Sequence, residues 1–135
     1  ASMGGAMTYK YAFQSQHPVK SIAVINGFVG KEISIPESIS FPVCVFHSLG
    51  DSVVNFNGGL INDAIGVTVE KLTQSAGFSG EAKKCQKDVA EFAESVMRTI
   101  EYFGLHVDIQ LTNPEDMTFS MLLYQGYHPI LEITA

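Results

Sequence analysis

The chain has 135 residues, of which 46% are hydrophobic and 16% are charged. This composition suits a single domain with a packed core and differs from that of a disordered chain. Eight lysines and arginines against fourteen aspartates and glutamates give a net charge of −6. Because phosphates repel a negative chain that has no basic stripe, the sequence disfavours nucleic acid as a partner.

Residues 1–6 are small, uncharged and rich in glycine. We interpret them as a cloning remnant and assign the domain to residues 7–135. No segment approaches the roughly 18 consecutive apolar residues that cross a bilayer. The start also lacks the basic and then apolar profile of a signal peptide. The expected location is therefore the cytoplasm, with no membrane partner.

The first strands are expected around a tight turn. Apolar runs at residues 19–25 and 28–35 flank Asn26 and Gly27. This dipeptide favours the two positive φ angles of a type I′ turn. The pattern therefore predicts an antiparallel hairpin.

A second strand pair is expected directly afterwards. Residues 41–47 form a nearly continuous apolar run, which is typical of a strand covered on both faces. Residues 48–51 have the composition of a turn, so we expect residues 52–56 to pair with the strand before it.

Two helices are expected in the middle of the chain. Apolar residues at positions 61, 65, 69, 72 and 76 fall on one helical face. Residues 81–104 carry a longer apolar stripe, with charged residues on the remaining surface. Gly104 is placed to end this long helix.

The C-terminal third has the pattern of a three-strand meander at residues 105–112, 117–124 and 127–134. Pro129 cannot donate to a strand ladder, which predicts an edge position for the last strand. The expected fold is therefore α+β, with antiparallel strands packed around the long amphipathic helix at residues 81–104.

Cys44 and Cys85 are the only cysteines. The sequence has no CxxC motif and no cluster of cysteine and histidine at metal-ligand spacing. We therefore expect two buried free thiols, with no disulfide, no metal site and no cofactor.

A loop rich in glycine and asparagine precedes the first expected helix. It contains Asn55, Asn57, Gly58 and Gly59. Glycine amides at the start of a helix can bind an anion, which the helix dipole also favours. The alternative interpretation is a plain connecting loop, because the loop lacks the lysine and spacing of a phosphate-binding loop.

Two histidine and aspartate pairs are the candidates for proton transfer. His47 and Asp51 flank one turn and could act as a base with an orienting carboxylate. His106 and Asp108 lie two apart on one face of an expected strand. For the first pair the alternative is a capped turn, since no serine or cysteine nucleophile is tied to it. The second pair could share a proton or a metal, but two ligands make a poor metal site, so the alternative is a solvated sheet face.

Aromatic residues surround the last expected hairpin and form a candidate protein interface. Tyr124, Tyr127, His128 and Pro129 lie beside the predicted edge strand, where a partner or a second copy could pair. An ordinary aromatic cluster within the hairpin is the alternative.

No motif in the chain indicates catalysis. The leading hypothesis is a non-enzymatic binding protein, such as an adaptor, chaperone or inhibitor of a protein partner, that forms a homo-oligomer. The alternative is a small-molecule or nucleotide-binding protein or enzyme. It would hold a small anionic ligand with Gly58, Gly59, His47 and Asp51.

Overall fold

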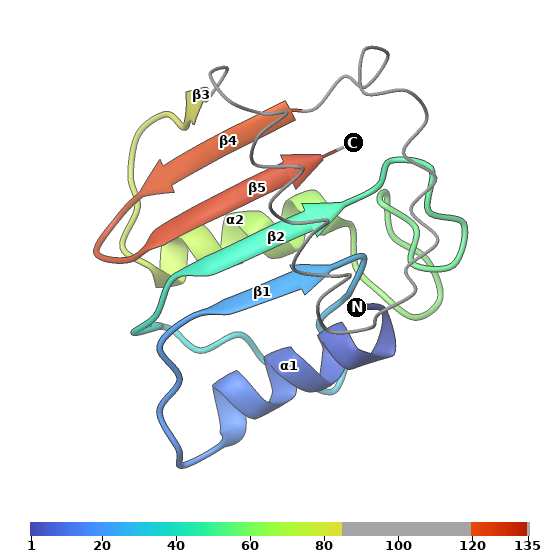
Figure 1. Ribbon diagram of the computed structural model, residues 1–135, viewed down its shortest axis with the longest axis horizontal. Helices are drawn as coiled ribbons and strands as arrows, with labels where there is room; N and C mark the ends of the chain where they lie inside the picture. The colour runs from blue at the N-terminus through green and yellow to red at the C-terminus, as the bar shows by residue number, and fades with distance from the viewer. Residues whose placement is uncertain (85–119, 135) are drawn as a thin grey trace, which may run out of the picture.

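The computed structural model describes residues 1–84 and 120–134 (Figure 1). Within them, five strands form one mixed sheet in the order β1-β2-β5-β4-β3. In chain order the elements are α1 (Met3–Gln14), β1 (Ile22–Ile25), β2 (Val43–His47), α2 (Ile65–Ser75), β3 (Lys83–Lys84), β4 (Ser120–Gln125) and β5 (Pro129–Thr134).

The sheet is parallel in one half and antiparallel in the other. β2 pairs in parallel with β1 and with β5, so Val43 lies between Ile22 and Ile130. β4 pairs antiparallel with β5 and with β3. As its apolar run predicted, β2 is a central strand in which four of the five residues are buried.

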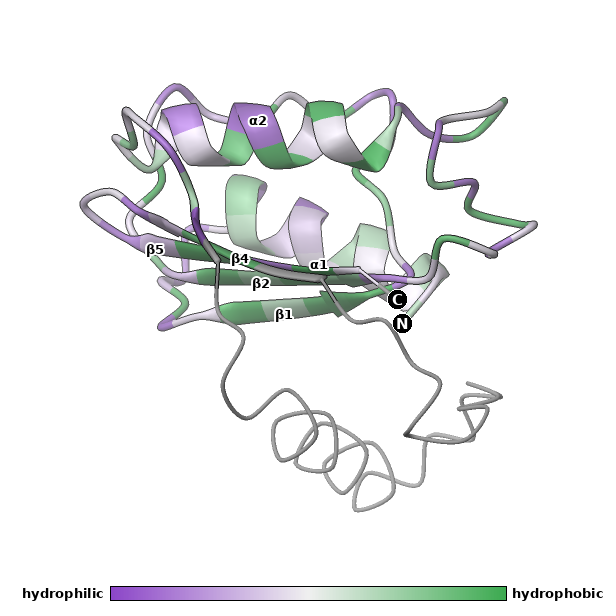
Figure 2. Cartoon of the chain, turned by 90° about the horizontal axis from the view of Figure 1, so that it is seen from above, coloured by the Kyte–Doolittle hydropathy of each residue, from purple (hydrophilic) through white to green (hydrophobic). Residues whose placement is uncertain are grey.

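The helices α1 and α2 lie on the same side of the sheet (Figure 2). Tyr9 from α1 and Leu72 from α2 are almost fully buried and join one core cluster with sheet residues such as Val24, Val45 and Ile130. None of the helices formed by residues 1–84 and 120–134 is long and apolar enough to cross a membrane.

The predicted antiparallel arrangement around a long helix is wrong. The described residues contain no long amphipathic helix, and the C-terminal part is no antiparallel meander. Lys83 and Lys84, expected in the first turn of the helix at residues 81–104, instead pair with β4 as β3. Pairing with a neighbouring strand has overridden the local helical pattern there. Residues 85–104 lie outside the described residues.

The hairpin predicted at Asn26 and Gly27 is also wrong, because residues 28–35 form no strand and β1 pairs instead with β2, in parallel. A type I′ turn needs a positive φ at both residues, and of these two only Asn26 has one, at 46°. The Asn26 amide donates to the Phe46 carbonyl at 2.8 Å, and its side-chain Oδ1 accepts the Ser48 amide at 2.7 Å. These bonds hold the chain against β2 instead of turning it back along β1.

Residues 52–56 do not pair with β2, contrary to the second hairpin prediction. The neighbours of β2 are β1 and β5. Asp51 Oδ1 accepts the amides of Val53 and Val54, each at 2.9 Å. These two bonds curl the chain into a compact turn.

The edge position predicted from Pro129 is wrong, because β5 lies between β2 and β4. Pro129 is the first residue of its strand, where the missing amide is tolerated. The antiparallel pair of β4 and β5 was predicted correctly. The strand expected at residues 105–112 lies outside the described residues. The edge-strand argument for self-association through β5 therefore no longer applies.

α2 confirms the helical face predicted in this region, although it begins only at Ile65. Its end is defined by Gly77, whose φ of +75° places it in the left-handed region. The amides of Phe78 and Gly77 donate to the carbonyls of Thr73 and Gln74 at 3.0 and 3.1 Å, the pattern of a Schellman cap. This cap places Phe78 beside β4.

α1 begins within the segment that we interpreted as a cloning remnant. Ser2 donates its amide to the carbonyl of Ile25 at 3.1 Å, and Gly5 is buried against Gly27. Tyr9 and Phe13 stack with ring centroids 5.6 Å apart. The first residues of the chain thus contact the carboxyl end of β1.

Candidate functional site

His47 and Asp51 share one turn but bond to different groups. His47 ends β2 with 1% exposure, and its Nε2 lies 2.7 Å from the Val54 carbonyl oxygen. Its Nδ1 has no hydrogen-bond partner in the part of the chain that the structure describes. The Asp51 carboxylate instead accepts the amides of Val53 and Val54. The contacts therefore show a capped turn instead of a base with its orienting carboxylate.

The amides of the glycine loop are already hydrogen-bonded within the loop. Asn57 donates to Asn55 Oδ1 at 2.9 Å, Gly58 to the Asn55 carbonyl at 3.0 Å, and Gly59 to the Asn62 carbonyl at 2.9 Å. The first amide of α2, that of Ile65, donates to a loop carbonyl as well. An anion at this loop would have to displace these bonds. Anion binding by these residues stays a prediction.

Asn62 is a structural residue that the sequence analysis missed. It is 2% exposed, and its Nδ2 donates to the carbonyls of Asn55 and Asp63 at 2.9 and 2.8 Å. It therefore closes the loop between β2 and α2. One asparagine among several nearby gives no sequence signal for this role.

The other metal and thiol candidates give no site within the described ranges. Cys44 is a free, half-buried thiol, and burial raises its pKa to about 11. It therefore stays protonated and unreactive at neutral pH. Cys85, His106 and Asp108 lie outside the described residues. Among residues 1–84 and 120–134 no three metal-ligating side chains gather.

The four residues predicted as an interface are divided between the turn and the sheet. Tyr127 is 90% exposed and lies over Gly77, while its amide donates to the Ala76 carbonyl at 2.8 Å. The half-buried His128 follows in the same turn, and the exposed Pro129 begins β5. Tyr124 instead lies within the sheet.

Tyr124 is held by two contacts. Its hydroxyl donates to Glu132 Oε2 at 3.1 Å, and its ring meets the Phe78 ring edge-on, with centroids 5.3 Å apart. Burial raises the pKa of Tyr124 to about 12, so the hydroxyl remains a donor at physiological pH. Burial also raises the pKa of the half-buried Glu132 carboxyl, although the Tyr124 hydrogen bond opposes the rise.

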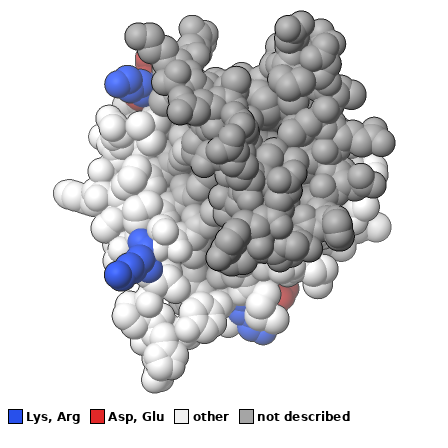
Figure 3. All heavy atoms as spheres, viewed as in Figure 1, with Lys and Arg blue, Asp and Glu red and all other residues white. Residues whose placement is uncertain are grey.

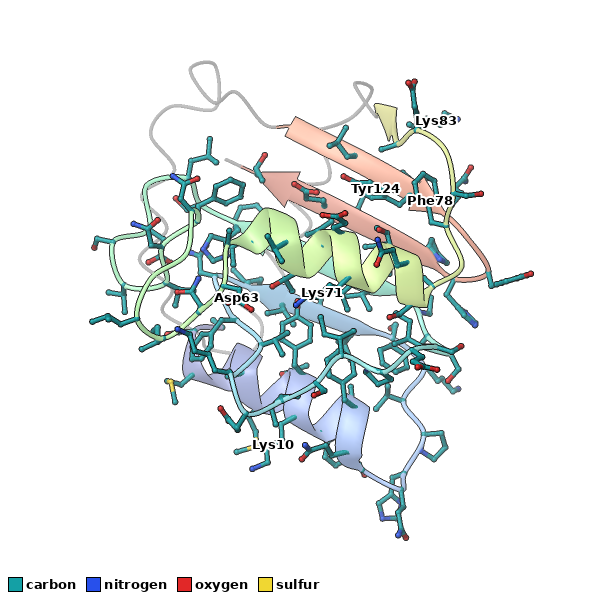
Figure 4. All side chains as sticks on the ribbon, turned by 180° about the vertical axis from the view of Figure 1, so that it is seen from behind. Lys10, Asp63, Lys71, Phe78, Lys83 and Tyr124 are labelled. Atoms are coloured by element: carbon teal, nitrogen blue, oxygen red, sulfur yellow. The ribbon has the colours of Figure 1, made fainter. Side chains whose placement is uncertain are left out.

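These residues line a groove of about 460 Å³ between α2, the segment after it and the sheet. We call it the tyrosine–glutamate groove and define it by Glu70, Thr73, Phe78, Tyr124 and Glu132. Figure 4 shows Tyr124 and Phe78 together on one side of α2. The groove combines a half-buried carboxylate, a second acidic side chain and two aromatic rings.

A second groove of about 530 Å³ lies between α2 and the loop from β1 to β2. We call it the lysine groove and define it by Lys31, Glu37, Asp63, Lys71 and Ser75. Asp63 and Lys71 lie on the side of α2 opposite to Tyr124 (Figure 4). α2 therefore separates an acidic, aromatic groove from one of mixed charge.

The sequence analysis missed Phe78 and Glu132 as site residues. Glu132 had a signal, because with histidine counted as neutral it is the one formally charged residue between positions 117 and 135. Its alternation with Ile130 places both on the face of the sheet that α2 covers. Phe78 gave no signal, because its position depends on the cap at the end of α2.

Charged side chains are scattered on the face that Figure 3 shows, where the described lysines form no continuous patch. No family model, no curated protein and no solved structure matches the chain. The geometry of the two grooves is therefore the basis for the function.

Proposed function

We propose that this protein binds a basic segment of a partner protein, with one lysine or arginine side chain in the tyrosine–glutamate groove. The observation that carries the proposal is the half-buried Glu132 carboxylate. Its Oε2 accepts the Tyr124 hydroxyl, and burial of this carboxyl raises its pKa.

The electrostatics of Glu132 favour a cation. Partial burial makes ionisation of this carboxyl costly, and a positive charge within about 4–6 Å would favour the ionised form again. A carboxylate has several acceptor positions, of which the Tyr124 hydroxyl occupies one. The remaining positions can accept hydrogen bonds from an ammonium or guanidinium group. Glu70 adds a second negative charge to the groove.

The aromatic walls suit the rest of such a side chain. Lysine and arginine carry apolar stems that pack along apolar surface while the charged end forms polar contacts. The rings of Phe78 and Tyr124 provide that surface. A cation over an aromatic face contributes about 0.5–1 kcal/mol at exposed sites.

Two features favour a protein segment over a small free amine. The net charge of −6 attracts basic macromolecules at long range and speeds their encounter. Tyr127 is 90% exposed and covers Gly77, the neighbour of Phe78 in the chain. A peptide that enters the groove can contact this ring as well, whereas a small amine would be too short.

The proposal is tested by calorimetric titration with a basic peptide, in which glycine alternates with lysine and arginine. We expect the wild-type protein to bind it, and higher salt to weaken the binding. The variant Glu132→Gln should bind at least tenfold more weakly, because loss of one partner of a desolvated charge pair costs about 2–5 kcal/mol.

Glu32→Gln is the matched control, since it removes the same charge from a residue that lines neither groove. We expect it to bind as the wild type does. Absence of binding by the wild type would refute the proposal. Equal weakening by the two variants would also refute it, because the attraction would then come from net charge alone.

A further inference from the structure

The loop from β1 to β2 contacts the segment at each end of the lysine groove, the end of α2 on one side and the loop before α2 on the other. Near the end of α2, Ser75 Oγ donates to the Pro36 carbonyl at 2.5 Å, and the Ile39 amide donates to the Ser75 carbonyl at 3.0 Å. Near its start, Lys31 Nζ lies 3.5 Å from the Gly59 carbonyl. The space of about 530 Å³ between these anchors is in the range of small-molecule sites.

The charges that line this groove cancel but do not pair. Lys31 and Lys71 contribute two positive charges, and Glu37 and Asp63 two negative charges. All four side chains are exposed. Within the described residues no ion pair joins them. A ligand with only one sign of charge would therefore meet repulsion as well as attraction.

The charges are nevertheless separated along the groove. Lys31 contacts the loop before α2, and Asp63 lies two residues before the helix. Lys71 lies six residues into α2, and helical side chains tilt toward the start of their helix, so its ammonium group adds a second positive charge on this side of the groove. Glu37 follows Pro36, which is bonded to the last residue of α2, so the other end is negative. The helix dipole has the same direction, favouring an anion at the start of α2 and a cation at its end.

We propose that the lysine groove binds a small zwitterion of the α-amino acid class. Its carboxylate lies between Lys31 and Lys71, and its ammonium group faces Glu37. Polar groups of Thr68, Gln74 and Ser75 line the same space and can bond to the ligand. This site lies on the opposite side of α2 from the tyrosine–glutamate groove and is independent of the function proposed there.

The test is titration of the full chain, followed by backbone amide NMR, with α-amino acids that have uncharged side chains, such as glycine, L-serine and L-glutamine. At least one should saturate and shift amides in residues 30–37 and 68–75. Inorganic phosphate and methylammonium, each with one sign of charge, should bind at least tenfold more weakly. The proposal is overturned if no amino acid binds or if phosphate binds equally well.

Variants locate the site. The double variant K31Q/K71Q should lower the affinity for the bound amino acid at least tenfold. The double variant K10Q/K20Q removes the same charge outside both grooves and should leave it unchanged; Lys10 lies on α1, away from the groove (Figure 4). The single variant Glu37→Gln should weaken binding of the amino acid as well. It tests the site even if the double variant K31Q/K71Q does not fold. Equal affinities in all these variants would overturn the assignment.

Discussion

Gly5 of α1 touches Gly27 in the loop after β1. A Cβ added to Gly5 would lie 2.8 Å from the Gly27 Cα, and a Cβ added to Gly27 would lie 2.9 Å from the Gly5 Cα. Neither residue has room for a side chain while the helix stays in place. This contact fixes α1 against the sheet at the carboxyl end of β1.

Substitution of Gly5 by alanine should therefore destabilise the protein. Overpacking of a close contact costs about 1–3 kcal/mol, which outweighs the helix propensity gained by alanine. Gly4 is the control, because a Cβ there meets nothing within 4 Å. Gly4→Ala should raise the free energy of unfolding by up to about 1 kcal/mol. Urea denaturation of both variants measures the difference, and equal stabilities would contradict the contact.

Asn26 is expected to tolerate glycine better than alanine. Both substitutions remove the hydrogen bond from the Ser48 amide, which contributes about 0.5–1.5 kcal/mol. Alanine must in addition adopt the left-handed φ of 46°, which glycine adopts without strain. Asn26→Ala should thus lower the midpoint of urea unfolding further than Asn26→Gly. The reverse order would show that residue 26 is not left-handed.

Gly126 in the turn between β4 and β5 should tolerate no side chain. A Cβ there would contact the Ala76 carbonyl oxygen and lie 2.7 Å from the Phe78 amide nitrogen. Gly126→Ala should therefore separate the turn from the end of α2 and cost about 1–3 kcal/mol. Gly66→Ala is the control on α2, with no atom within 4 Å. Thermal unfolding that shows no loss in Gly126→Ala would contradict this packing.

The contribution of Glu132 to the free energy of unfolding should decrease as pH rises. Burial raises the pKa of this carboxyl in the folded state, so the folded protein holds the proton more tightly than the unfolded chain. This stabilising contribution is complete below the ordinary glutamate pKa, about 4.3. It is lost as pH rises through the raised pKa that Glu132 has in the folded protein. The Glu132→Gln variant lacks this pH-dependent contribution, because glutamine does not titrate. Relative to the wild type, the variant should gain stability across that window, as urea unfolding at several pH values would measure.

The strands β1, β2, β4 and β5 and the helix α2 could be predicted from local pattern, because their burial follows periodicity, whereas the strands expected at residues 28–35 and 52–56 did not form. The apolar run that became β2 and the buried face of α2 are examples. Pairing could not be predicted in the same way. Asn26 and Gly27 have the composition of a hairpin turn, yet their bonds to Ser48 and their contact with Gly5 depend on residues far along the chain.

The candidate site was predictable only in part, for the same reason. Tyr124 was singled out as a member of an aromatic cluster, but its partners Phe78 and Glu132 come from two other segments. The lysine groove joins residues about 40 positions apart, Lys31 and Lys71. Neither lysine belongs to a local motif, so sequence spacing gives no signal for their approach.

The central claim is that the Glu132 carboxylate receives a cation from a basic segment, and its pKa tests this most directly. The carboxyl carbon of Glu132 can be titrated by carbon-13 NMR, once alone and once with a saturating basic peptide. A cation beside the carboxylate favours its ionised form, so we predict that the peptide lowers the pKa of Glu132. An unchanged or raised pKa in the saturated complex would contradict the claim.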